Sequence, residues 1–171
     1  ERNTYFLMIG RLSPEKGYVQ ICRILKSYFP EMDIRVVGGG DESIANELVS
    51  LGVQVLGWKD AEGVKVLVQH ARALIFPSVW YEADGLVVLE AMATGIPVLC
   101  SDCCSARALV KDGEHGRHFS FDKPETIVAI FEQFLRDATI KAWSEKAYTD
   151  YWQQPRSDRS HILQVVELIG K

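Results

Sequence analysis

The sequence of 171 residues contains no apolar stretch of the roughly 18 to 20 residues that a helix needs to cross a bilayer. Its longest apolar run, residues 86–93, is interrupted by the acidic Glu90. An initiating Met and a signal peptide are also absent, because the chain opens on Glu1 and enters an apolar segment at once. We therefore expect an excised fragment without a membrane-spanning helix.

An excess of basic residues is missing as well. The formal net charge is −4, which argues against a nucleic-acid partner, since such a partner favours a basic face. The composition, 47% hydrophobic and 25% charged, is ordinary for a soluble globular protein. A chain of 171 residues with this composition forms one domain with a sizeable core more readily than two.

Cysteines are few, and three of the four cluster in the sequence. Cys100, Cys103 and Cys104 include one C-x-x-C spacing, and Cys22 stands apart. A zinc or redox site is one interpretation, but no second Cys or His pair follows at ligand spacing. The favoured interpretation is reduced, structural thiols, because Cys100 ends an apolar strand, where cysteine behaves as a small hydrophobe. Reduced thiols predict a cytoplasmic location.

Short β-rich segments alternate with amphipathic helical segments over residues 1–122. The expected strands are Tyr5–Ile9, Ile34–Val37, Val53–Leu56, Ala73–Phe76 and Pro97–Leu99, with a weaker one at His118–Phe121. The expected helices between them are Tyr18–Phe29, Glu42–Leu51, Ala61–Gln69 and Leu86–Thr94. Short apolar strands separated by helices predict an α/β fold, a Rossmann-like parallel sheet with helices on both faces.

The pattern after residue 122 is helical only. The expected helices are Pro124–Ala138, Ile140–Tyr151 and a last one capped by Ser157 or Asp158. We therefore predict one domain over residues 1–171, with an α/β core at 1–122 and a helical C-terminal tail at 123–171. A parallel sheet binds ligands outside the carboxyl ends of its strands, so the loops that follow strands are the candidate sites.

The loop after the first strand reads Gly10-Arg11-Leu12-Ser13-Pro14-Glu15-Lys16-Gly17. Ser13 is a good helix N-cap and Pro14 suits the first helical position, so a helix is expected to begin here. Arg11 and Lys16 flank that helix start, and two cations beside a helix N-terminus favour an anion site, most plausibly for phosphate. The alternative is a pair of solvated surface charges.

The loop after the second strand contains Gly38-Gly39-Gly40. Three glycines allow the backbone to approach a ligand closely, and Gly39 is a candidate contact. The signal is weak by itself, because many strand-to-helix turns are rich in glycine. It also departs from the G-x-G-x-x-G pattern of dinucleotide-binding folds, since position 43 is Ser43.

Residues 77–97, after the fourth strand, carry the most informative pattern. The helix expected from Leu86 is apolar nearly all round and is predicted to be buried, with Glu90 inside it. A buried carboxylate needs partners, either in a structural ion pair or among ligand hydroxyls in a cleft. A phosphate on the backbone amides of Gly85–Val87 would leave an attached ribose near Glu90. Glu82, in the preceding loop, would lie on the opposite side of that phosphate.

Glu82 and Glu90 form an E-x7-E pair within P-S-x-x-x-E-x-x-G-L-x-x-L-E-A-M-A-x-G-x-P-V. This segment resembles the donor-site motif of family 4 glycosyltransferases and their GT-B relatives. Residues 10–17 resemble the phosphate-binding segment of the same family, and residues 37–40 and 55–58 follow in the expected order. The resemblance covers nearly the whole chain, and four ordered motifs together are highly specific.

The resemblance implies roles for the matching positions. Arg11 and Lys16 would neutralise the donor diphosphate, Glu90 would hold the ribose hydroxyls, and Glu82 would bind the donor sugar. Backbone near Leu56 and Gly57 would hold the base. Family members commonly have Gly-Phe where this chain has Ala83-Asp84, so donor-sugar identity stays open, and Asp84 is either a sugar contact or a solvated residue. The expected donor-binding residues are Gly10, Arg11, Lys16, Gly39, Leu56, Gly57, Glu82, Asp84, Gly85, Leu86, Val87 and Glu90.

The resemblance also implies retention of the anomeric configuration, with Glu82, Arg11 and Lys16 as catalytic residues. Cations and a helix dipole at the departing diphosphate would act by electrostatic preorganisation. The sequence has no Asp-x-Asp pair, so no catalytic metal and no cofactor is implied; the substrate would be a UDP-sugar or a GDP-sugar. GT-B enzymes bind the acceptor in an N-terminal domain, which this chain lacks.

The predicted function is thus donor binding in a glycosyltransferase (hexosyltransferase) that modifies a glycan or lipid-linked acceptor in surface polysaccharide synthesis. The fragment is expected to bind nucleotide sugar and to need its missing N-terminal domain for transfer. Peripheral contact with the inner face of the membrane would come through that missing half. The alternatives are a regulatory module that binds nucleotide sugar without catalysis, and a GT-B-like sugar-nucleotide epimerase.

Overall fold

The computed structural model describes residues 4–80, 85–153 and 155. Its strands are β1 (Phe6–Ile9), β2 (Ile34–Val37), β3 (Gln54–Val55), β4 (Ala73–Phe76), β5 (Val98–Ser101) and β6 (Gly116–Phe119). Its α-helices are α1 (Tyr18–Tyr28), α2 (Glu42–Ser50), α3 (Ala61–Gln69), α4 (Leu86–Ala93), α5 (Pro124–Phe134) and α6 (Asp137–Gln153). Two short 3₁₀ helices complete this part of the chain, η1 (Pro14–Lys16) and η2 (Ser105–Ala108).

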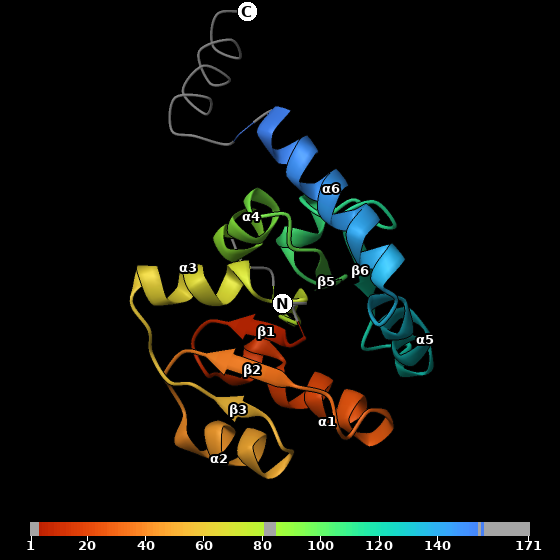
Figure 1. The fold of residues 1–171 in the computed structure, drawn as a ribbon. Coiled ribbons are helices and arrows are strands. Elements are labelled where there is room, and N and C mark those ends of the chain that lie inside the picture. The colour runs from red at the N-terminus through yellow and green to blue at the C-terminus, as the bar shows by residue number, and fades with distance from the viewer. Residues whose placement is uncertain (1–3, 81–84, 154, 156–171) are drawn as a thin grey trace, which may run out of the picture.

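The strands form one six-stranded sheet in the order β3-β2-β1-β4-β5-β6, and every neighbouring pair is parallel (Figure 1). The chain moves outward from β1 through β2 to β3, then returns to the other side of β1 and continues outward from β4 to β6. The predicted Rossmann-like parallel sheet is confirmed. Its strand order reverses between β1 and β4, which makes that position the topological switch point of the sheet.

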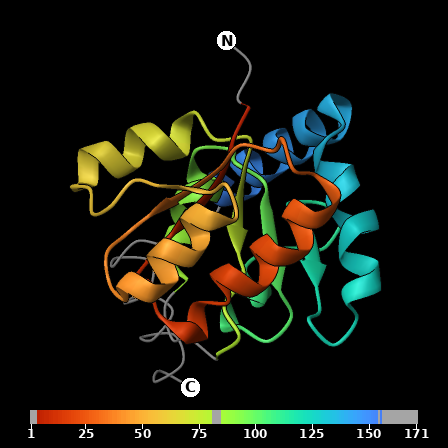
Figure 2. The ribbon, with the colours of Figure 1, turned by 90° about the horizontal axis from the view of Figure 1, so that it is seen from below.

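Helices cover both faces of the sheet, as predicted, because side chains alternate along each strand. Phe6 and Met8 of β1 join one buried cluster with α1, α2 and α5, whereas Leu7 joins a second cluster with α3 and α4. Helix α6 contributes Trp143 to the first cluster and Ala147 to the second. It therefore runs past the β6 edge of the sheet and contacts both layers (Figures 1 and 2).

The first two tail helices meet at a different place from the one predicted. Helix α5 ends at Phe134 and α6 begins at Asp137, whereas the expected break lay at residue 139. Arg72 explains the position, because its Nε donates to the Phe134 carbonyl at 2.7 Å and its guanidinium pairs with Asp137 at 2.9 Å. A side chain from the α3–β4 connection thus satisfies the end of one helix and the start of the next. The last predicted helix, near Ser157, lies outside the described residues.

None of the helices in the described part of the chain combines the length and the apolar character that crossing a bilayer requires.

Candidate functional site

The loop after β1 and the loop after β4 meet at the switch point. The backbone amide of Val79 donates to the Glu15 carbonyl at 2.9 Å, and the buried hydroxyl of Ser78 donates to the same carbonyl at 3.2 Å. Gly17 has φ +66°, and a Cβ at this position would overlap the Pro77 carbonyl oxygen. Glycine is therefore required here both for its backbone conformation and for the close approach of the two loops.

The predicted helix start at Ser13 is only partly correct. Pro14–Lys16 form the 3₁₀ turn η1, and α1 begins after Gly17. The Ser13 side chain caps no backbone amide; its hydroxyl instead donates to Glu15 Oε1 at 2.6 Å. The left-handed conformation of Gly17 separates η1 from α1, because that conformation ends one helix before the next can start.

Arg11 and Lys16 both lie on this loop. The Arg11 guanidinium is 3.2 Å from Glu15 Oε1, and its side chain is 71% exposed. The pKa of Glu15 lies below its usual value. The largest cause is the hydrogen bond from the Ser13 hydroxyl, followed by one from the Glu15 backbone amide and by the contact with Arg11. The Lys16 side chain lies over Gly10, with its Cε 3.8 Å from the position of a Cβ there. An incoming anion would therefore meet Lys16 beside the end of β1 and would compete with Glu15 for Arg11.

The glycine run after β2 is joined to this loop through its backbone. The amide of Leu12 donates to the Gly39 carbonyl, and the amide of Asp41 donates to the Leu12 carbonyl, both at 2.9 Å. A Cβ on Gly38 would overlap the Gly10 carbonyl. Two of the three glycines, at positions 38 and 40, thus serve loop packing, because both have positive φ and face backbone. Gly39 is exposed, and no atom lies within 4 Å of the position that a Cβ would take there, so this glycine is accessible to a ligand.

The loop after β3 is hydrogen-bonded to the glycine run after β2. The Gly57 carbonyl accepts from the Gly38 amide at 2.9 Å, and the Leu56 amide donates to Val36 at 2.8 Å. Gly57 has φ +67° with open space around a Cβ. The following Trp58 is 76% exposed. The structure therefore brings together the predicted loop residues Gly10, Gly39, Leu56 and Gly57 at the carboxyl edge of the sheet.

The prediction that α4 is buried all round, with Glu90 inside it, is wrong. Val88, Ala91 and Met92 are buried, but Leu86 is 63% exposed and Glu90 is exposed. Leu86 and Glu90 are four residues apart and so share one face of the helix. The sequence did not indicate this exposed face, because apolar residues occupy both the buried and the exposed side of the helix.

The start of α4 has no side-chain cap, since Gly85 is its N-cap residue. Its backbone packs against η2, where a Cβ on Gly85 would come within 3.0 Å of the Ala106 side chain. The Val88 and Leu89 amides donate to the Gly85 carbonyl at 2.9 and 3.1 Å. The first amides of a helix generally point out of its N-terminus, and this property suits a helix start to anions. Glu82 and Asp84 lie outside the described residues.

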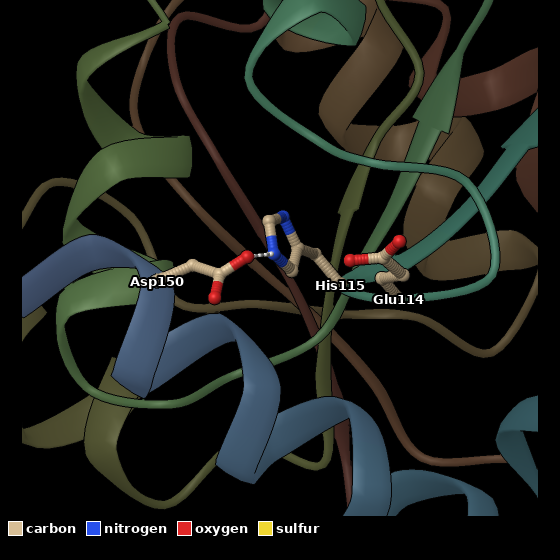
Figure 3. A group of neighbouring side chains, drawn as sticks. All are labelled: Glu114, His115 and Asp150. Carbon is tan, nitrogen blue, oxygen red and sulfur yellow. Dashed lines mark hydrogen bonds and ion pairs between the residues drawn. The ribbon is translucent and has the colours of Figure 1, made fainter. Parts of the chain in front are cut away.

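One group of potential metal ligands occurs among the described residues, formed by Glu114, His115 and Asp150. Figure 3 shows the His115 ring directed at Asp150 of α6, with Nε2 at 2.9 Å from Oδ2. Lys111 and Lys146 also bind Asp150, at 3.0 and 2.8 Å. The lysines and His115 lower the pKa of Asp150 well below its usual value, Lys146 first among them. Because two cations bind one carboxylate, this group is an ion-pair network that links α6 to the β5–β6 connection.

A family model described as "Glycosyl transferases group 1" matches residues 1–150. The chain belongs to this family. A phosphatidyl-myo-inositol mannosyltransferase of Mycobacterium leprae is 29% identical over 177 residues, which cover 96% of this chain and 47% of the relative. The chain thus spans about half the length of the curated relatives that it matches.

Solved structures share the fold of this chain. An Anabaena protein, Alr3699/HepE in complex with UDP, matches with a TM-score of 0.81 at 22% identity, over 98% of this chain and 49% of that one. The C-terminal domain of a group 1 glycosyl transferase, LpcC of Francisella tularensis, matches with a TM-score of 0.74 at 15% identity, over 90% and 87% of the two chains. The fold is therefore the Rossmann-like, C-terminal half of a GT-B glycosyltransferase.

Ser78 and Ser101 link the loops of the candidate site, and the sequence analysis did not single them out. Both are buried polar side chains, and the Ser101 hydroxyl donates to the Ser78 carbonyl. Ser78 in turn binds Glu15, so these two residues tie β5 to the loop that carries Arg11 and Lys16. Ser78 stands in the quoted P-S pair, but a buried hydroxyl gives no periodic signal that would reveal its partner.

Proposed function

We propose that this chain binds the nucleotide-sugar donor, a UDP-sugar or a GDP-sugar, in a retaining glycosyltransferase. The proposal depends on one observation: backbone hydrogen bonds at the switch point hold the Arg11–Lys16 loop against the loops after β2 and β4. Ligands of open α/β sheets bind outside the carboxyl ends of the strands at such a point. A structural relative solved with UDP supports a nucleoside diphosphate as the ligand.

Lys16 and Arg11 are proposed to bind the diphosphate. Negative charge grows on the diphosphate as the anomeric bond breaks, and fixed cations stabilise that charge without reorganisation. Lys16 folds over Gly10 at the end of β1. Arg11 is exposed and held by Glu15, so it is free to exchange that surface ion pair for a phosphate contact.

The acidic residues are proposed to bind the two sugars of the donor. Glu90 would accept hydrogen bonds from the ribose hydroxyls, which its exposed place on α4 supports. Glu82 would bind the donor sugar and stabilise positive charge at its anomeric carbon, with Asp84 as a second sugar contact. The backbone of Gly39, Leu56 and Gly57 would hold the base. The backbone amides of Gly85, Leu86 and Val87 would hold phosphate at the start of α4.

The complete enzyme is proposed to transfer a hexose to a glycan or lipid-linked acceptor in surface polysaccharide synthesis, at the cytoplasmic side of the membrane. A relative that is named as a phosphatidyl-myo-inositol mannosyltransferase supports a lipid-linked acceptor and a mannosyl donor. The acceptor would bind to an N-terminal domain that precedes this chain in the whole protein. Transfer is proposed to need no metal ion, because cations of the protein take the place of one at the diphosphate.

Calorimetric titration of the chain with UDP, GDP and ADP, and with their sugars, tests the proposal. We expect at least one nucleoside diphosphate to bind below millimolar concentration. Lys16→Ala and Glu90→Gln should each weaken binding about tenfold or more, the scale of one lost charge-assisted hydrogen bond. Lys65→Ala and Glu145→Gln, at exposed ion-paired positions on α3 and α6, are matched controls and should bind as the wild type does.

Assays of the full-length protein separate the two alternatives. An epimerase would convert free nucleotide sugar without an acceptor, whereas a regulatory module would bind it and turn over nothing. The proposed transferase releases nucleoside diphosphate only when an acceptor is present and gives a product with the donor's anomeric configuration. Absence of nucleotide binding by the wild-type chain at millimolar concentration would refute the donor-binding role.

A further inference from the structure

Two buried cysteines lie in contact beside the proposed donor site. Cys100, on β5, and Cys104, just before η2, are fully buried, with their sulfur atoms 3.4 Å apart. Both thiols also lie 3.4 Å from the Ser101 carbonyl. Cys103 is exposed, and its sulfur is 3.3 Å from Asp102. Cys22 lies in the other core layer.

The two contacting thiols have opposite acidities. The Cys100 thiol, the Ser101 hydrogen bond and the backbone amides of η2 lower the pKa of Cys104 to about 6. The partner thiol and burial raise the pKa of Cys100. Of the two thiols in contact, Cys104 is therefore the more acidic, and Cys100 is placed to donate its S–H to the Cys104 thiolate. A thiolate is the reactive form of cysteine, and a second thiol in contact can resolve an oxidised one.

We propose that Cys100 and Cys104 are a redox-sensitive site that a hydroperoxide converts into an intramolecular disulfide. The Cys104 thiolate attacks the hydroperoxide, so that an S–O bond forms, the O–O bond breaks and an alcohol leaves once protonated. The Cys100 sulfur then attacks the resulting sulfenic acid, so that the S–S bond forms, the S–O bond breaks and water leaves with the Cys100 proton. In sum, two thiols and one hydroperoxide give one disulfide, one alcohol and one water.

Oxidation at this site is expected to affect the loops of the proposed donor site through the hydrogen bonds of Ser101. A disulfide needs its sulfur atoms about 2 Å apart, so residues 100–104 must move when the bond forms. The same reaction removes the Cys100 S–H donor, which lies 3.4 Å from the Ser101 carbonyl. The Ser101 hydroxyl binds Ser78, and Ser78 binds Glu15 on the Arg11–Lys16 loop. We therefore expect the oxidised form to bind nucleotide more weakly; this consequence rests on the proposed function, whereas the disulfide does not.

Peptide mapping by mass spectrometry tests the disulfide directly. The chain is treated with hydrogen peroxide at pH 7.5, free thiols are blocked, and the digest is searched for linked peptides. We expect a Cys100–Cys104 link that dithiothreitol reverses, in the wild type and in Cys103→Ser and Cys22→Ala. Cys104→Ser should form no link. Thiols that stay free, or a wild-type link through Cys103, would overturn the proposal, and this result does not depend on how any variant folds.

Nucleotide titration of the reduced and oxidised chain tests the transmission to the donor site. The expected result is an affinity that falls severalfold on oxidation and returns on reduction, in the wild type and in Cys103→Ser. An unchanged affinity of a chain shown to be disulfide-linked would overturn the transmission and leave the site itself standing. A reduced chain that binds no nucleotide would refute the donor-binding role instead, while the mapping result would still decide the disulfide.

Discussion

Gly17 is the residue on which the closest contact between the two switch-point loops depends. Its φ of +66° lies in the left-handed region, and the Pro77 carbonyl occupies the space beside its Cα. An L-residue in this conformation costs about 1–2 kcal/mol even without a clash. The backbone carbonyl adds an obstacle that no side-chain rotation can remove.

Gly17→Ala should lower the free energy of unfolding by at least about 2 kcal/mol, because strain and overlap act together. Gly52→Ala is the matched control, since Gly52 has φ +77° but its nearest neighbour is the flexible end of Lys26 at 3.5 Å. The control should lose only about 1 kcal/mol. Urea unfolding of the three proteins measures both values, and equal losses would contradict the overlap with Pro77.

Asp150 gives the fold a predictable dependence on pH. Its pKa is depressed by Lys146, Lys111 and His115, so its stabilising contribution is complete above the unfolded-state pKa of about 3.9. The contribution is lost as the pH falls through that value toward the lower folded-state pKa. The backbone amide of Lys111 donates to His115 Nδ1, which leaves the Nε2 proton to face Asp150.

Asp150→Asn should be less stable than the wild type by about 1–3 kcal/mol at pH 7, because it weakens three charge-assisted contacts at once. The difference between the two proteins should shrink as the pH is lowered from 5 to 3. Unfolding by urea at several pH values measures it. Glu145→Gln, at an exposed pair on the same helix, should stay within about 0.5 kcal/mol of the wild type. A difference that grows toward low pH would contradict the sign of the pKa shift.

At the scale of elements, the junction of α5 and α6 depends on aromatic packing. Phe131 is fully buried and lies 4.7 Å from Phe6 and 6.2 Å from Phe134, measured between ring centroids. Phe134 in turn packs against Trp143 of α6 at 4.9 Å. One continuous aromatic row thus joins β1 to both tail helices.

Phe131→Ala should cost about 3–5 kcal/mol, the range for removing a large aromatic side chain from a core. Leu135→Ala, one turn further along and 44% exposed, should cost less than about 1 kcal/mol. Thermal or chemical unfolding compares them. Similar losses for both variants would show that the tail helices are held by something other than the aromatic row.

Elements whose boundaries depend on local sequence were predicted well. The bounds of β2, β4 and α3 match the prediction, because short apolar strands and an Asp60-capped amphipathic helix carry their signals locally. The α5–α6 boundary depends on Arg72, a residue more than sixty positions away, and no local pattern encodes such a partner. The exposed face of α4 was not predicted, because Leu86 is apolar and its residue type alone suggests a core position, whereas its side chain is exposed.

The candidate site could be predicted in its loops but not in its side-chain geometry. The glycines at positions 10, 38 and 57 mark strand ends, and the strand order that brings those ends together follows from the βαβ pattern. The Arg11–Glu15 pair and the Ser78–Ser101 contacts depend on distances that only the fold supplies. Glu82 stays a prediction drawn from the family resemblance.

For the whole molecule, the exposed apolar residues at the carboxyl edge bear on the proposed acceptor domain. Trp58, Trp80 and Leu86 are 76%, 67% and 63% exposed, and each follows or adjoins the carboxyl end of a strand. Large exposed apolar side chains are candidates for contact with another molecule or domain. They lie on the side where the proposed acceptor domain would close over the donor.

The isolated chain should bind nucleotide but transfer no sugar, because the acceptor site is proposed to lie in the other domain. Joining it to the proposed acceptor domain should restore transfer. Release of nucleoside diphosphate, measured with and without acceptor for both forms, checks this. Transfer by the isolated chain would contradict the two-domain scheme.

The loops at the switch point are joined to one another largely through main-chain hydrogen bonds, from Gly10 to Val37, from Leu12 to Gly39 and from Val79 to Glu15. Because main-chain atoms make these contacts, an outward side chain such as that of Trp58 is not needed to hold the loops together. Substitutions there are expected to change contacts with the proposed donor at little cost in stability. Such a scaffold is suited to diversification, with ligand preference drifting by single replacements while the framework beneath stays fixed.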